Sequence, residues 1–348
     1  MAVHWSWPWG QESSLELETN MGWDFQSTSS SNGQPDSTTV YTYPGSPTRF
    51  SWAQDDALFN NSFTLPTEAW VPAGWLCVPF YANGTLNSNT FIFEVKGGSS
   101  GRTIAIRHAS GGTGQLYVDS NFKANFAGLT INNWHFLALQ YDMTADPWSG
   151  RVYLNGVAAT AQFTDAQNPE TAGNYTFFGF TGGTRATYYG GIIVYNSTSD
   201  SGETPLFVTR LAPNDDGTGA GGTVGTWVPS SGPDDFAVTN TDPFSNSTFT
   251  QEASPSSLDQ CVTEVTNMTT QLGITPPSIA AITGHTYSSG SGIVVNAGVG
   301  SGSNYTAGDN AVPNAGDTTY AFGTAPVDPT GGGAWSSGTT VRFRYKVV

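Results

Sequence analysis

Two stretches decide how this chain folds: WHFLALQY at residues 134–141 and GRVYLNG at residues 150–156. Aliphatic, β-branched and aromatic residues dominate both stretches, and such residues favour β-strands. The Asn-Gly dipeptide that ends the second stretch is the preferred sequence of a two-residue hairpin turn. The sequence therefore predicts two strands here and a tight turn at Asn155-Gly156.

Further short stretches of the same kind lie along the rest of the chain, and Gly, Asn, Asp or Ser residues bound them. They are found at residues 75–80, 91–95, 103–107, 115–118, 175–179 and 191–195, and then at 236–238, 278–283, 292–295, 319–322 and 341–348. Many short strands at regular spacing are typical of a β-sandwich or a barrel. In the closing strand, alternation predicts inward apolar residues and outward basic ones, Arg342 among them.

Length and composition indicate two domains. The chain has 348 residues, which is long for one domain and sufficient for two. Charged residues make up only 11% of it, and abundant Gly, Ser, Thr and Asn disfavour helices. A Gly- and Asp-rich stretch at residues 200–232 has the composition of a linker or a long loop. We predict an all-β fold with an N-terminal arm at residues 1–20 and two β-sandwich (jelly-roll) domains, at 21–203 and 204–348.

The charge balance excludes some partners. Acidic residues outnumber basic ones by 27 to 11, and the formal net charge is −16. A phosphate backbone would be repelled, so we expect no nucleic acid as a partner. No apolar run approaches the ~20 residues of a membrane helix, so we expect no membrane insertion. The first residues lack the basic start and apolar stretch of a signal peptide, which predicts synthesis in a cytoplasm.

The N-terminal segment HWSWPWG, residues 4–10, alternates polar and aromatic residues. This period is that of a short strand with one aromatic face, formed by Trp5, Trp7 and Trp9. Such a face packs either on its own domain or on a neighbouring subunit, because an uncovered row of Trp side chains promotes aggregation. We favour the second interpretation, an assembly arm in a homo-oligomer.

The run at residues 129–142, with residues 150–157, resembles the laminin-G-like, concanavalin-A-like domains. Those domains carry a W-H-x-(V/L)-A-L strand, a turn, and then G-x-(V/L)-x-L-Y-V-N-G. The resemblance covers roughly residues 20–200 and implies two adjacent antiparallel strands of a jelly roll. Residues 188–196 stand where the family has its final strand, but they lack that strand's acidic pair. Such domains do many jobs, so the resemblance implies a fold rather than a function.

The second half of the chain is similar to a pattern found in tailed-phage virion proteins. Residues 208–217 and 225–232 follow its form L-x-P-x-x-D-G and then W-x-P-S-x-G. Residues 332–348 match its closing G-x-x-W-(T/S)-x-x-x-(V/L)-x-x-x-(R/K)-x-x-V. This similarity implies a location in a virion, with other capsid or tail proteins as partners.

Catalytic motifs are missing from the sequence. Glycan hydrolases on a concanavalin-A-like fold carry Glu-x-Asp-x-Glu on one strand, whereas Glu16-Leu17-Glu18 and the lone Glu94 lack that spacing. The four His residues have no metal-ligand spacing, and neither a G-x-S-x-G elbow nor a Gly-Lys-Ser/Thr phosphate loop occurs. We therefore expect a protein without enzymatic activity.

Calcium is the one cofactor that the laminin-G-like resemblance suggests, held by Asp side chains at an edge of the sandwich. The candidate ligands are Asp119, Asp142 and Asp146. For each of them we favour the alternative of a turn-forming Asp that caps its own backbone. No cofactor is therefore predicted.

Together these observations predict a structural protein on the exterior of a virion, either a capsid decoration or a head or tail appendage, which contacts host-surface glycans. A first alternative is a glycan-binding tail-tip or fibre adhesin. In that case Trp148, Tyr188 and Tyr189 would stack on sugar faces, although each ring could equally serve as a packing residue. A second alternative is a polysaccharide depolymerase with a diverged site.

Overall fold

The structure, a computed structural model, is built almost entirely from β-strands. It describes residues 3–7, 24–26, 34–36, 51–55, 62–82, 90–109, 111–179, 186–206, 208, 211, 213–225, 227–230, 250–252, 259–272, 279–289, 295–306, 310–311 and 318–347. Within these residues the helical elements are a single 3-10 turn at Thr67–Ala69 and helix α3 (Met268–Leu272), which confirms the all-β prediction. In the same ranges, no helix has the length and apolar character needed to cross a membrane.

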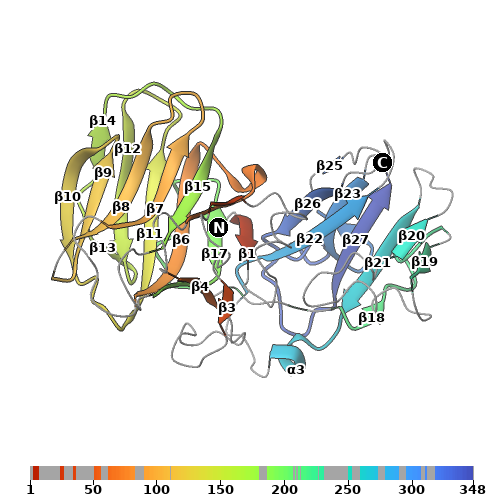
Figure 1. The fold of residues 1–348 in the computed structure, drawn as a ribbon. Coiled ribbons are helices and arrows are strands. Elements are labelled where there is room, and N and C mark those ends of the chain that lie inside the picture. Colours follow the sequence, from red (N-terminus) through yellow and green to blue (C-terminus); the bar gives the residue numbers. More distant parts are fainter. Residues whose placement is uncertain are drawn as a thin grey trace. The chain divides into compact units, whose positions relative to one another are not determined.

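The chain forms two compact units, Met1–Thr209 and Arg210–Val348. The first unit is a sandwich of two antiparallel sheets (Figure 1). Among the described residues, its larger sheet has ten strands: β1 (Val3–Trp7), β3 (Gln34–Asp36), β4 (Ser51–Asp55), β6 (Ala73–Ala82), β11 (Trp134–Asp142), β12 (Trp148–Leu154), β13 (Val157–Ala158), β14 (Phe163–Asp165), β16 (Ala186–Tyr189) and β17 (Ile192–Tyr195). Its smaller sheet has seven: β2 (Asp24–Gln26), β5 (Ser62–Thr64), β7 (Thr90–Gly97), β8 (Thr103–Ala109), β9 (Thr113–Val118), β10 (Asn121–Ala127) and β15 (Gly173–Phe178).

Residues 134–141 lie in strand β11, and residues 150–154 lie in strand β12. They pair antiparallel, with Leu139 opposite Val152. Asn155 and Gly156 have φ angles of 51° and 86°, as a type I′ turn requires. The predicted strands and their hairpin turn are therefore confirmed.

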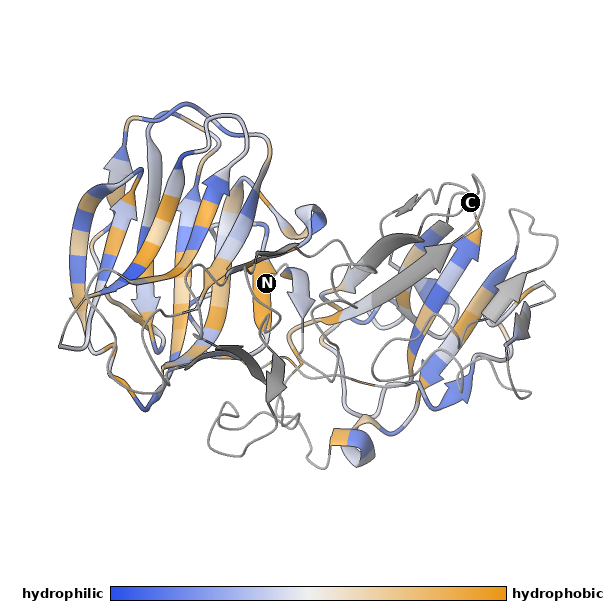
Figure 2. Cartoon of the chain, in the orientation of Figure 1, coloured by the Kyte–Doolittle hydropathy of each residue, from blue (hydrophilic) through white to orange (hydrophobic). Residues whose placement is uncertain are grey.

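Aromatic side chains join the two sheets of the first unit. Phe63 of β5 stacks on Phe177 of β15 with ring centroids 4.9 Å apart. Tyr189, from β16 of the other sheet, meets the Phe63 ring edge-on at 5.6 Å. Its buried hydroxyl donates hydrogen bonds to the carbonyl oxygens of Ile92 and Phe178, at 2.7 and 2.6 Å. Figure 2 shows hydrophobic and hydrophilic residues alternating along several strands of the first unit, for example β8 and β9.

The first strand, β1, corrects the prediction of an assembly arm. It pairs antiparallel with β17, and Trp5 lies opposite Val194. Trp5 is 0% exposed and Trp7 is 2% exposed, so neither ring is left open to pack on a neighbouring subunit. Pairing with β17 satisfies the backbone of the segment and buries its aromatic face at the same time. Trp9 lies outside the described residues.

The second unit packs a two-stranded sheet against a larger one. Within the described residues the larger sheet has six strands: β18 (Asp215–Asp216), β21 (Gln260–Val265), β23 (Val295–Ser301), β24 (Asn304–Tyr305), β25 (Asn310–Ala311) and β27 (Val341–Val347). The two-stranded sheets are β22 (Ile282–Ser289) with β26 (Thr318–Ala325), and β19 (Trp227–Pro229) with β20 (Thr250–Glu252). The core between β22, β26 and the larger sheet consists of Val265, Met268, Ile282, Val299, Ala325, Trp335 and Val341.

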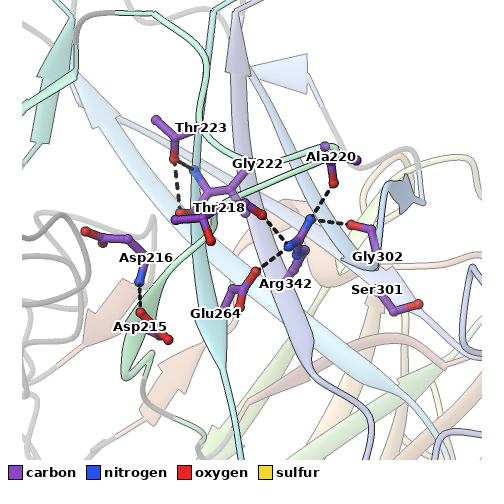
Figure 3. Close-up of polar contacts among 12 residues, drawn as sticks. Asp215, Asp216, Thr218, Ala220, Gly222, Thr223, Glu264, Ser301, Gly302 and Arg342 are labelled. Atoms are coloured by element: carbon purple, nitrogen blue, oxygen red, sulfur yellow. Dashed lines mark hydrogen bonds and ion pairs between the residues drawn. The ribbon is translucent and has the colours of Figure 1, made fainter.

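Strand β27 places Arg342 on the side away from the core residue Val341, as the alternation predicts. The neighbours of Arg342 alternate as predicted, with Val341 fully buried and Phe343 packed against the core. The Arg342 guanidinium is bound by other groups of the chain (Figure 3). It forms an ion pair with Glu264 of β21 at 2.6 Å and donates hydrogen bonds to the carbonyl oxygens of Thr218, Ala220 and Gly302. Carbonyl oxygens of loops thus hold the Arg342 side chain on the outward side of the strand.

Candidate functional site

The three rings predicted to stack on sugars are buried. Trp148 and Tyr189 are 0% exposed, and Tyr188 is 6% exposed. The Trp148 indole donates its one hydrogen bond to the Asn168 carbonyl oxygen at 2.8 Å. A ring without an exposed face cannot stack on a ligand, so the sugar-stacking role predicted for these three residues is wrong. They pack the interior of the first unit, which was the alternative weighed for each of them.

Of the three candidate calcium ligands, Asp119 lies in the turn between β9 and β10, whereas Asp142, the last residue of β11, and Asp146 lie at the connection between β11 and β12. Asp119 has a φ angle of 47° and forms an ion pair with Arg102 at 3.6 Å. The Asp142 carboxylate accepts hydrogen bonds from the backbone N–H and the hydroxyl of Thr144, at 2.9 and 2.6 Å, and so caps its own turn. Asp146 is exposed and precedes Pro147. Across the described part of the chain, no group of three or more His, Cys, Asp or Glu residues is placed to hold a metal ion.

A different set of side chains gathers on the outer side of the smaller sheet. Here the aromatic row denotes Phe178 of β15, Phe91 of β7, Arg107 of β8, Tyr117 of β9 and Phe122 of β10. These five strands are consecutive neighbours in the sheet (Figure 1). Four of the side chains are half-buried, and Phe122, the last in the row, is 50% exposed. The row therefore crosses the sheet on the side that faces solvent.

Each member of the aromatic row touches the next. The Phe178 and Phe91 ring centroids are 5.2 Å apart, and those of Tyr117 and Phe122 are 5.7 Å apart. Between these pairs lies the Arg107 guanidinium. Its carbon is 3.9 Å from the centroid of the Phe91 ring and 4.1 Å from that of the Tyr117 ring. Both distances are within the range of cation–π attraction, so the rings hold the guanidinium between them.

Two β-bulges place aromatic residues in this row. Phe93 of β7 faces the core and is 0% exposed. In a regular strand Phe91 would lie on the same side, since it is two residues away. The register shifts between Phe91 and Phe93, which leaves Phe91 directly opposite Arg107. A second shift, between Phe122 and Ala124, leaves Phe122 opposite Tyr117. A bulge adds one residue to one strand and turns the following side chains to the other face.

Amide groups line the exposed end of the row. Gln115 lies opposite Arg107 on the neighbouring strand and donates a hydrogen bond to the Asn125 side-chain oxygen at 3.1 Å. The Tyr117 hydroxyl donates to the Gln115 side-chain oxygen at 3.3 Å. The face thus combines ring surfaces with hydrogen-bonding groups that are open to a ligand.

Arg107, Lys96 and Glu94 are charged residues of β7 and β8 that influence one another. Burial is the main cause that raises the pKa of Glu94, and the positive charges of Lys96 and Arg107 counteract part of that rise. The Nε atom of Arg107 is buried without a hydrogen-bond partner, and no ion pair to Arg107 exists among the described residues. The terminal nitrogens of Arg107 are therefore left for solvent or for a ligand.

The sequence places four members of the aromatic row in predicted strands, leaves Phe122 outside them and gives none of the five a role. Residues 91–95, 103–107 and 115–118 were all predicted as strands, and their members of the row fall near strand ends. A single strand shows only one ring or one arginine. The signal that identifies the site is the register between strands, which the sequence does not display.

No protein-family model matches this sequence, and no curated protein does. The resemblances to laminin-G-like domains and to phage virion proteins therefore stay predictions. Among solved structures, the chain is similar to Trypanosoma rangeli sialidase in complex with sialic acid, at 9% identity and a TM-score of 0.35. That match covers 44% of this chain and only 26% of the sialidase.

Two further solved structures come from a toxin and a phage. The binding domain of botulinum neurotoxin DC in complex with SialylT is 14% identical, with a TM-score of 0.35, over 51% of this chain and 43% of that one. A conserved carbohydrate esterase from the Shiga toxin-encoding bacteriophage phi24B is 15% identical, with a TM-score of 0.39, over 56% of this chain and 99% of that one.

These comparisons correct the expectation that the chain lacks enzymatic activity. Solved structures similar to it include sialidases and a carbohydrate esterase, so that exclusion does not stand. Similarity of this degree assigns no reaction to the chain.

Proposed function

We propose that this chain is an exterior component of a tailed-phage particle and that its aromatic row binds glycans of the host surface. The observation that carries the proposal is the continuous row of ring contacts on the solvent side of the smaller sheet. Soluble proteins rarely expose contiguous apolar surface without a binding role.

The chemistry of the row suits a sugar chain. The C–H faces of a pyranose are apolar and pack on aromatic rings, whose faces carry negative charge density. The hydroxyls of the sugar need hydrogen-bonding partners, which the amides of Gln115 and Asn125 provide. Strands lie about 4.8 Å apart, so five neighbouring strands span roughly 19 Å. A surface of that length accommodates an oligosaccharide better than a single sugar.

The location on a phage rests on the sequence. The pattern at residues 208–217, 225–232 and 332–348 resembles tailed-phage virion proteins. A glycan-binding surface would let such a protein attach the particle to its host, because the exterior of the particle makes the first contact with the host. Antibody against this chain should therefore label intact phage particles. Particles that carry no label would remove the virion part of the proposal.

Binding of the purified full chain to a glycan array tests the row itself. Phe122→Ala and Tyr117→Ala should each weaken binding about fivefold, since one aromatic contact is worth about 1 kcal/mol. Val157→Ala is the matched control, because Val157 is 69% exposed on a strand of the other sheet. Absence of binding by the unmodified chain, or binding that survives both ring substitutions, would overturn the proposal. The recovered glycans should also be sized, since shortened chains would show cleavage.

A further inference from the structure

We infer that the glycan bound by the aromatic row is acidic and that Arg107 holds its carboxylate. This inference rests on the proposed function of the row and names the class of sugar that it takes.

The first step is that Arg107 is fixed before any ligand arrives. Its guanidinium carbon lies within about 4 Å of the ring centroids of Phe91 and Tyr117, which stand on either side of it. A flexible side chain loses rotamer freedom when it binds, whereas one already held between two rings loses less. The rings thus preorganise a cation in the middle of the row.

The second step is that no carboxylate among the described residues forms an ion pair with this cation, although the charge of Glu94 lies near enough to attract it. Other basic residues form ion pairs: Arg342 pairs with Glu264, and Lys123 pairs with Asp165. Acidic residues outnumber basic ones by 27 to 11, so a partner would be easy to supply. Among the described residues Arg107 nevertheless forms no ion pair, and its buried Nε has no hydrogen-bond partner. An ordered, partially desolvated and unpaired guanidinium is a site for an anion.

The third step concerns the shape of that anion. A guanidinium presents N–H groups in a planar fork, which matches the two oxygens of a carboxylate. Gln115 lies directly opposite Arg107, and its amide is hydrogen-bonded to Asn125. A ligand that carries both a carboxylate and hydroxyl groups satisfies the cation and the amides together. Uronic and sialic acid residues have that combination.

Glu94 is an acidic side chain on the same strand as Phe91. It lies opposite Ala105, two residues before Arg107 on the same strand, and it is half-buried. Its carboxylate forms no ion pair with Arg107, although burial raises its pKa and the positive charges of Lys96 and Arg107 counteract part of that rise. Glu94 therefore leaves the forked N–H groups of Arg107 available.

The experiment uses the full chain and matched pairs of oligosaccharides. Each pair consists of an acidic oligosaccharide and its neutral counterpart, in which the carboxylates have been reduced to alcohols. We expect the chain to bind acidic members at least tenfold more tightly than their reduced counterparts. Equal binding of both members would overturn the acidic assignment and leave the glycan-binding proposal standing. Failure to bind any member would overturn both.

Three variants assign the preference to one residue. Arg107→Gln should lose the preference for acidic members, and Arg107→Lys should keep only part of it, since an ammonium lacks the planar fork. Arg151→Gln is the matched control, because Arg151 is half-buried on the other sheet and its Nε is likewise unpartnered. Circular dichroism checks that each variant folds. If Arg107→Gln does not fold, the preference measured for Arg107→Lys decides whether Arg107 recognises the carboxylate. A preference unchanged in both Arg107 variants would overturn the inference.

Discussion

At the scale of single residues, buried charges in this chain are held by hydrogen bonds from loops. Glu170 is 2% exposed and lies against the turn between β7 and β8. Its carboxylate accepts hydrogen bonds from the backbone N–H groups of Ser99 and Ser100, at 2.9 and 3.2 Å, and from the Ser100 hydroxyl at 2.5 Å. Burial alone would raise the pKa of Glu170, but these hydrogen bonds outweigh it and lower the pKa. One carboxylate thereby anchors the end of a hairpin.

Glu170→Gln should lower the free energy of unfolding by about 2 kcal/mol at pH 7, because hydrogen bonds to a charged acceptor are lost. A lowered pKa means that the stabilisation is complete above the unfolded value of about 4.3 and is lost as the pH falls through the folded value. Urea unfolding at pH 7, 5 and 3 should thus show the two proteins converging at the acid end. Glu68→Gln, at an exposed site, is the control. A difference that grows on acidification would contradict this account.

At the scale of elements, turns and bulges decide which residues face the solvent. The hairpin between β12 and β13 needs positive φ at Asn155 and at Gly156. Asn155 tolerates that conformation and accepts a hydrogen bond from the Phe136 backbone N–H at 2.8 Å through its side chain. The bulges of β7 and β10 have the larger consequence, because they bring Phe91 and Phe122 to the outer face.

Gly156→Ala should destabilise the chain by about 1–2 kcal/mol, the cost of a Cβ in the left-handed region. An added Cβ would also come within 3.3 Å of the Pro205 side chain. Gly333→Ala is the control, since its Cβ would meet open space and its φ is not in that region. Thermal unfolding of both variants measures the effect. Equal midpoints for Gly156→Ala and the unmodified chain would contradict the assigned turn.

At the scale of the whole molecule, each of the two compact units has its own core. Trp5 belongs to the first core, whereas Arg342 fastens the loop at residues 218–222 to the larger sheet of the second unit. Removing Trp5 leaves a cavity, and removing the Arg342 fork leaves Glu264 without its ion pair. The two losses should affect separate cooperative transitions, because each falls within one unit.

Calorimetry of the full chain should therefore resolve two transitions. Trp5→Ala should lower the midpoint of one of them, at a cost of about 3–5 kcal/mol. Arg342→Lys should lower only the other, because a lysine cannot donate to several carbonyls in a fixed fork. A single transition that both variants shift would show that the units unfold together. A Trp5→Ala protein of unchanged stability would also contradict the burial of β1.

The sequence by itself determined the class of the fold. The period of two and the turn residues identified β11, β12 and the Asn155-Gly156 hairpin, because these signals are local. The same local signals placed Trp5 incorrectly, since alternation shows that a strand has two different faces but not which residues cover each face. The position and composition of the aromatic row follow only from the tertiary structure. Its members meet through the register between strands and through two bulges, and a shift of one residue moves a side chain to the opposite face.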